Sequence, residues 1–247
     1  MRSDRLDALR GLAMVWMTAF HLSFDLSYFG LWPQDFYNDP RWTAQRTCIV
    51  SLFLLCAGAG QALAVHRGQS GSAFTRRWLQ IAGCALLVSL GSWWMFPRSF
   101  IYFGVLHGMA VMLLLLRLGA TRWRGGDGLW WLLGALALAL PWLGPLIVRS
   151  HPGLDLLNQP GLNWIGLTSR KPITEDYVPL LPWLGLMLWG FAGTRWLLRH
   201  RPHWLQGPVP AGGRPLAWLG TWSLSYYMLH QPVMIGLLSV ARRLSNA

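Results

Sequence analysis

The stretch DALRGLAMVWMTAFHLSFD, residues 7–25, decides the fold of this chain, because it has the length and apolar character of a bilayer-crossing helix. Such a helix needs roughly 17 to 25 mostly apolar residues. Comparable stretches recur along the whole chain, and we expect seven spans, near residues 8–27, 44–65, 76–95, 99–117, 129–148, 178–198 and 217–241. The sequence therefore predicts an all-α fold, a polytopic transmembrane helix bundle of about seven spans, with the lipid bilayer as a partner.

The composition excludes a water-soluble domain. The chain of 247 residues is 53% hydrophobic and 12% charged, and it contains 17 Trp, which is too apolar and aromatic for a soluble protein of this length. The connections between the expected spans are short, apart from residues 149–177 and 200–215. We expect a single transmembrane domain over residues 1–247.

The net charge of +12 indicates membrane orientation and no nucleic-acid partner. Most of the 21 basic residues fall in alternate connections between spans, and an excess of Arg and Lys in short loops marks the cytoplasmic side. The pattern predicts a cytoplasmic amino terminus.

The three cysteines, Cys48, Cys56 and Cys84, all lie within expected spans and form no Cys-x-x-Cys pair. Neither a disulfide framework nor a metal site is indicated by this spacing. We expect these residues to serve packing.

Polar side chains form one stripe along the first span. Arg10, Met14, Met17, His21 and Asp25 follow at steps of three or four residues, so they share one helix face. At 1.5 Å per residue His21 lies about 16 Å along the axis from Arg10. Asp25 lies one turn further, where its carboxylate is expected to reach and orient the imidazole.

Two more histidines fall inside apolar spans, His107 in FGVLHG and His230 in SLSYYMLHQP. Counted from the span ends, these two and His21 all fall at roughly 18 to 20 Å from the inner boundary of a ~30 Å core. Intramembrane ionisable groups usually line a cavity or pathway. We therefore predict one shared polar site with His21, Asp25, His107 and His230 as catalytic candidates. The alternative for each histidine is a hydrogen bond to a neighbouring helix.

An anionic ligand could bind at the cytoplasmic end of the spans. Arg76 and Arg77 open the third expected span, and Arg10 lies near the same side. Arginine holds phosphate through several fixed donors. These residues can equally serve as orientation signals.

Four motifs, RLDALRGLAMVWMTAFH, FGVLHG, YVPLLPWLGL and WLGTWSLSYYMLHQPV, resemble the bacterial branch of the heparan-alpha-glucosaminide N-acetyltransferase family over nearly the whole chain. The resemblance implies a transmembrane acyltransferase of the bacterial inner (cytoplasmic) membrane. Such an enzyme would move an acetyl group from cytoplasmic acetyl-CoA to an amino or hydroxyl group of an extracytoplasmic sugar or glycan. Arg10 would then meet the CoA phosphates, and His21 would mark the point of transfer.

The spacing suits this chemistry, because the distance from Arg10 to His21 is of the order of an extended pantetheine arm. His21 could act as a base or briefly carry the acetyl group itself. The residues also leave open a haem-binding membrane cytochrome with axial imidazoles and a proton-coupled transporter. A homo-oligomer is open as well.

Overall fold

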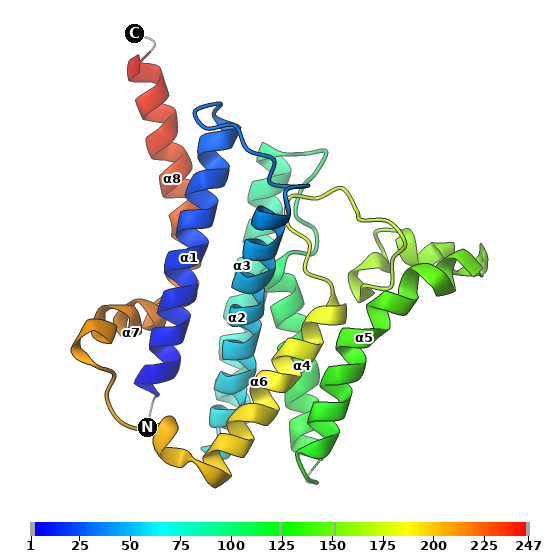
Figure 1. Cartoon of the computed structure of the whole chain (residues 1–247), viewed down its shortest axis with the longest axis vertical. Helices are drawn as coiled ribbons and strands as arrows, with labels where there is room; N and C mark the ends of the chain where they lie inside the picture. Colours follow the sequence, from blue (N-terminus) through cyan, green and yellow to red (C-terminus); the bar gives the residue numbers. More distant parts are fainter. Residues whose placement is uncertain (1–2, 124, 151, 246–247) are drawn as a thin grey trace. The chain divides into compact units, whose positions relative to one another are not determined.

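The computed structural model describes residues 3–123, 125–150 and 152–245. Within this part of the chain every regular element is a helix, which confirms the all-α prediction. The elements are α1 (Asp4–Tyr28), α2 (Pro40–His66), α3 (Gly71–Met95), α4 (Val105–Arg122), α5 (Gly128–Ser150), α6 (Leu180–His200), α7 (Arg214–Thr221) and α8 (Ser223–Ser245), with four short 3-10 helices at Pro152–Asn158, Asn163–Ile165, Pro202–Trp204 and Ala211–Gly213 (Figure 1).

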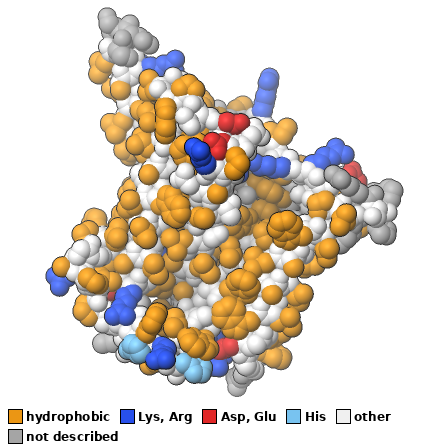
Figure 2. Space-filling model, in the orientation of Figure 1, with side chains coloured by type: hydrophobic (Ala, Val, Ile, Leu, Met, Phe, Trp, Pro, Cys, Tyr) orange, Lys and Arg blue, Asp and Glu red, His pale blue; other side chains and the backbone are white. Residues whose placement is uncertain are grey.

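Four helices have both the length and the apolar composition of a membrane span, namely Pro40–His66, Gly71–Met95, Val105–Arg122 and Gly128–Leu146. Much of their apolar surface faces outward. On α3, for example, Leu86 and Leu90 are more than 60% exposed and Trp94 is 85% exposed. Hydrophobic side chains are spread over the face of the molecule shown in Figure 2. Such surface is costly in water and stable in lipid, so this is a membrane protein.

The other long helices are α1, α6 and α8, with 25, 21 and 23 residues. They are long enough to cross a ~30 Å core, but they are less apolar than the four helices above. Two of them, α1 and α8, carry the predicted site residues His21 and His230.

Two predicted spans differ from the observed helices. The stretch 217–241 is broken at Trp222 into α7 and α8, and the stretch 99–117 becomes a helix only at Val105. Residues 99–103 instead form a turn and an irregular segment beside residues 174–178, with one parallel bridge between Phe103 and Tyr177. The N–H of Glu175 donates to the carbonyl of Ser99 (2.9 Å), and that of Val178 to Phe103 (3.2 Å). This long-range pairing uses backbone groups that a helix would have bonded locally.

The chain divides into two compact units. The described residues up to Phe53 and those from Pro202 onward form the first unit, and Leu54–Arg201 forms the second. Helix α2 contributes residues to both.

In the first unit, α1 starts where the sequence provides a helix start. The side chain of Ser3 accepts a hydrogen bond from the N–H of Leu6, and Asp4 and Asp7 in the first turn complement the helix dipole. The helix ends shortly before Gly30, whose φ of +74° suits glycine. The stretch 7–25 is thus one uninterrupted helix.

Helix α7 packs closely across the first turns of α1 (Figure 1). Two glycines permit this approach. A Cβ added at Gly11 would overlap the backbone carbonyl of Leu216, and one at Gly220 would overlap that of Asp7. Helix α8 then runs along the remaining part of α1. The two glycines therefore allow the close approach of α7 to α1, and α8 follows directly after α7 in the chain.

In the second unit, α5 packs against α6, and α4 contacts both α3 and α6. Phe191, Met112 and Leu116 are fully buried in its core. An ionic contact joins one end of the α5–α6 pair. Asp127 accepts from Arg195 Nε (2.8 Å) and from Arg199 (3.0 Å).

Candidate functional site

Two of the three predicted intramembrane histidines are in direct contact in the first unit. Nδ1 of His21 on α1 lies 2.7 Å from Nε2 of His230 on α8. The two rings are nearly parallel, with centroids 5.0 Å apart. His230 is buried and His21 is half-buried. The contact arises because α8 packs along the α1 face that bears His21.

A hydrogen-bond network surrounds His230. Its Nδ1 lies 2.7 Å from the carbonyl oxygen of Tyr227 on the same helix. The ring of Tyr226 is parallel to the imidazole at 5.8 Å, and its hydroxyl lies 2.7 Å from Oγ1 of Thr18. Thr18 donates in turn to the carbonyl of Met14 (2.8 Å). The imidazole of His230 is thus fixed by groups from both helices.

Asp25 does not make the expected contact with His21. Its Oδ1 accepts from Nε2 of Gln231 on α8 (3.0 Å), and its Oδ2 is buried without a hydrogen-bond partner among the described residues. Gln231 follows His230 directly, so α8 supplies a partner for each of the two polar groups on α1. The prediction that Asp25 orients the His21 ring is therefore wrong in its geometry, because His230 holds that position.

Arg10 lies near the start of the same polar stripe. Its guanidinium pairs with Oδ1 of Asp7 at 2.9 Å. Asp7 is only 2% exposed, and a buried carboxylate requires such a partner. Arg10 therefore balances the charge of Asp7 and keeps a part-exposed guanidinium at this end of α1.

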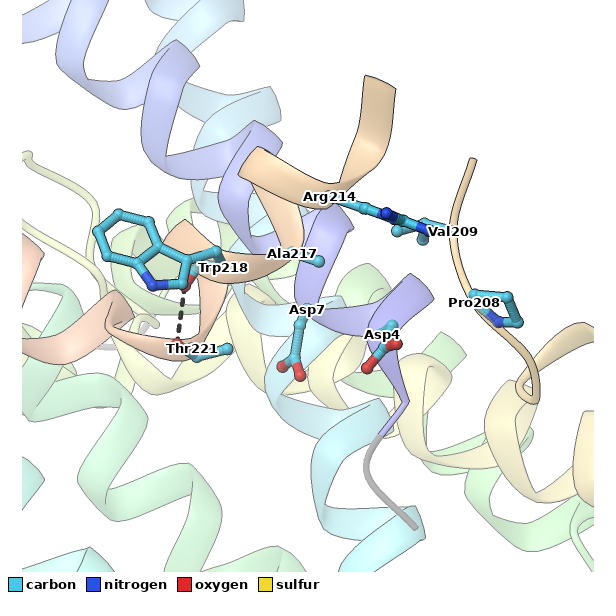
Figure 3. Close-up of a pocket in the computed structure, with 8 residues that line it drawn as sticks. All are labelled: Asp4, Asp7, Pro208, Val209, Arg214, Ala217, Trp218 and Thr221. Carbon is cyan, nitrogen blue, oxygen red and sulfur yellow. Dashed lines mark hydrogen bonds between the residues drawn. The ribbon is translucent and has the colours of Figure 1, made fainter. Parts of the chain in front are cut away.

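A pocket of about 270 Å³ opens beside this pair (Figure 3). It is lined by Asp4, Asp7, Pro208, Val209, Arg214, Ala217, Trp218 and Thr221. Sequence reasoning missed this pocket, because its walls come from α1 and from a segment about two hundred residues later in the chain. Asp7 contributes to the wall and also holds Arg10, so the pocket adjoins the polar stripe.

His107 lies in the second unit and is bonded to its own neighbours. Its Nδ1 accepts from the N–H of Gly104 at the start of α4 (3.3 Å). Its Nε2 lies 3.0 Å from Oγ of Ser89, which donates to the carbonyl of Ile101 (2.7 Å). Both ring nitrogens therefore have hydrogen-bond partners, and His107, in the first turn of α4, links the start of this helix to α3.

The start of α4 has a second support. The N–H of Val105 donates to Oδ2 of Asp176 at 2.7 Å, which satisfies one of the free N–H groups of a helix start. Together with His107, Asp176 fixes residues 99–105 against the end of the long connection.

The remaining arginine candidates, Arg76 and Arg77, lie on the first turns of α3 and are exposed. Arg77 donates to Oε1 of Gln80 at 3.0 Å. Among the described residues, no group of three or more His, Cys, Asp or Glu side chains could hold a metal ion.

The apolar helices define the class, an integral-membrane protein, and the contact between His21 and His230 places polar side chains between two of its helices. The chain belongs to the family described as heparan-alpha-glucosaminide N-acetyltransferase, catalytic, whose model matches residues 2–232. The protein is thereby a membrane acetyltransferase by family. Comparison with curated proteins and with solved structures gives no match.

Proposed function

We propose that this protein transfers an acetyl group from cytoplasmic acetyl-CoA to an amino or hydroxyl group of a sugar or glycan on the opposite side of a bacterial inner membrane. Family membership supports the acetyl transfer. In this proposal α1, α6 and α8 also cross the bilayer, which gives seven spans and a cytoplasmic amino terminus. The single observation that carries the proposed site is the contact between His21 and His230.

His21 is the proposed reactive residue. Acyl transfer to an amine or hydroxyl requires a base that removes a proton as the acceptor attacks the thioester carbonyl. His21 lies on a helix face that packs against α8, and a second histidine orients its ring, so it is suited to act as such a base. The same ring could instead accept the acetyl group and pass it on.

The donor is proposed to enter beside Arg10. His21 lies eleven positions after Arg10, which is about 16 Å along a helix and matches an extended pantetheine arm. Phosphate groups would compete with Asp7 for the guanidinium, and the adjoining pocket offers space at that end. Arg76 and Arg77 are exposed and are further candidates for phosphate contact.

We assign Asp25 and His107 to positioning. Asp25 ties α8 to α1 through Gln231, one turn from His21. His107 fixes the start of α4 with both ring nitrogens. Neither contact places these side chains in direct bonding with the histidine pair.

The haem alternative meets a geometric obstacle. Two axial imidazoles bind iron that lies between their nitrogens, whereas His21 Nδ1 and His230 Nε2 are at hydrogen-bond distance from each other. That distance leaves no room for a metal ion between these two atoms.

The test uses the purified protein in proteoliposomes, with radiolabelled acetyl-CoA outside and glucosamine or glucose inside. We expect label on the enclosed sugar only when the protein is present, and release of the free CoA thiol outside. Glucosamine reports amine transfer and glucose reports hydroxyl transfer. Absence of both the labelled sugar and the released thiol would contradict the proposal.

A further inference from the structure

We infer that the backbone carbonyl of Tyr227, acting through His230, keeps Nε2 of His21 free of a proton and makes it the reactive atom of the site. This inference rests on the proposed acetyl transfer and deepens it. It names His230 as a positioning residue and identifies one nitrogen of His21 as the base.

The carbonyl of Tyr227 determines which atom donates and which accepts in each of these hydrogen bonds. A carbonyl oxygen can only accept, so Nδ1 of His230 must carry the proton that bonds to Tyr227 at 2.7 Å. In a neutral imidazole the other nitrogen is then a bare acceptor. Nε2 of His230 therefore accepts from His21, and the proton in that 2.7 Å contact belongs to Nδ1 of His21.

The same rule applies once more to His21. With its proton on Nδ1, the neutral ring has an unprotonated Nε2. Among the described residues no hydrogen bond to this Nε2 occurs, whereas Nδ1 is fully used by His230. The His21 ring thus has one available lone pair, on Nε2, and the direction of this lone pair is set by the ring orientation that His230 holds.

With Nε2 of His21 as the base, the acetyl group is transferred as follows. The acceptor N–H or O–H bond breaks, its proton moves to Nε2 of His21, and the electron pair forms a bond to the acetyl carbon. The carbon–sulfur bond then breaks, and the CoA sulfur leaves with that electron pair. The sulfur takes the proton from Nε2 as free thiol, and His21 returns to its starting state. The acyl-carrying variant needs the same bare Nε2 as nucleophile.

His230 also provides a place for the transient charge. After proton uptake, the proton on Nδ1 of His21 can move to Nε2 of His230 across their 2.7 Å contact. The cationic His230 ring then faces the carbonyl of Tyr227 and the ring of Tyr226, which lies parallel at 5.8 Å. A cation over an aromatic face within about 6 Å is favourable.

The experiment separates tautomer from activity. Protein labelled with ¹⁵N-histidine is measured by NMR in alkaline buffer, where histidine is neutral, and His21→Gln identifies the His21 signals. We expect a protonated Nδ1 and an unprotonated Nε2 in the wild type. His230→Phe, which keeps a ring but has no acceptor, should mix the two tautomers of His21. The exposed His203→Gln is the matched control and should leave the His21 signals unchanged.

The kinetic arm uses acetyl-CoA and glucosamine. His230→Phe should lower kcat by roughly 10- to 100-fold, as loss of an orienting partner does, with little change in KM for acetyl-CoA. His230→Gln can still accept from Nδ1 of His21 through its amide oxygen, so it should restore much of the lost kcat. A merely structural role would not produce this rescue.

Three results would overturn the inference: a wild-type His21 protonated on Nε2, an unchanged tautomer in a folded His230→Phe, or equal kcat in the Phe and Gln variants. Wild-type protein with the expected tautomer but no acetyl transfer would contradict the proposed function and leave the tautomer assignment standing. The two failures are therefore distinguishable.

Discussion

His21 in the first unit and His107 in the second are both intramembrane histidines by sequence, yet their surroundings differ. His107 uses both ring nitrogens, one for the N–H of Gly104 and one for Ser89. His21 uses Nδ1 for His230, and its Nε2 makes no hydrogen bond to the described residues. The difference lies in the ring nitrogens: both are occupied in His107, whereas one is open in His21, and in our proposal that open nitrogen makes His21 the reactive residue.

The largest expected effect is that of His21→Ala on activity. Removal of the proposed base should lower acetyl transfer by about 10²- to 10⁴-fold, while the protein stays folded because the first unit keeps its aromatic core of Phe20, Phe36 and Trp42. Transfer of radiolabel from acetyl-CoA measures this, with elution from a size-exclusion column as the check of folding. Wild-type turnover by the variant would break the distinction between the two histidines.

Gly220→Ala should have the next largest effect, on the packing that brings α7 and α8 to α1. The added methyl group would overlap the backbone of Asp7, and such overpacking costs about 1–3 kcal/mol. Thermal unfolding in detergent measures the loss. Gly236→Ala on α8 is the matched control, since a Cβ there meets nothing within 4 Å. Equal midpoints for the two variants would show that the close approach of α7 is not required.

His107→Phe should mainly reduce stability. Loss of its bonds to Gly104 and Ser89 should lower the free energy of unfolding by about 1–2 kcal/mol, with the effect concentrated at the start of α4. Hydrogen exchange at the amides of residues 104–107 should accelerate, and kcat of the folded variant should stay within a few-fold of wild type. A loss of kcat as large as that of His21→Ala would place His107 in the chemistry after all.

The smallest effect concerns the long connection of the second unit. Tyr177 donates to the carbonyl of Asn163 at 2.6 Å, and burial raises the pKa of Tyr177 to about 12. Between about pH 10 and 12 the unfolded chain has lost this proton and the folded chain retains it, so stability falls as pH rises through this range. Tyr177→Phe should cost about 1 kcal/mol at neutral pH and flatten that alkaline decline. Unfolding midpoints across the range give the measurement, and an unaltered slope would contradict the assignment.

The sequence predicted the helical class, and it placed His21 and His230 in one polar site without predicting their direct contact. Both features depend on local periodicity and on span length, which are visible in the order of residues. Polar side chains in an apolar interior are stable only when they are hydrogen-bonded. The polar side chains of α1 and α8 form hydrogen bonds with each other.

The features that the sequence did not predict depend on contacts between segments far apart in the chain, and the periodicity of a sequence does not reveal such contacts. Asp25 is at the correct helical spacing from His21, but the amide of Gln231 takes its carboxylate. The apolar residues 99–103 match a helix by composition, but their backbone carbonyls pair with residues 174–178 and they are not helical. Trp222 interrupts a stretch that hydrophobicity alone reads as continuous. In the first two cases the observed structure depends on a partner far along the chain, and in the third it depends on the local backbone geometry at Trp222.

The ion pairs of Asp127 with Arg195 and Arg199 have a consequence for how the protein is made. Asp127 precedes α5 and both arginines lie at the end of α6, so in the proposed topology these contacts form only after both segments have been synthesised and inserted. Until then, in that topology, the two arginines would contribute their full positive charge to the cytosolic side, where basic residues favour retention. In that topology the ion pairs would stabilise the packing of α5 against α6 only once both helices have inserted, before α7 and α8 follow.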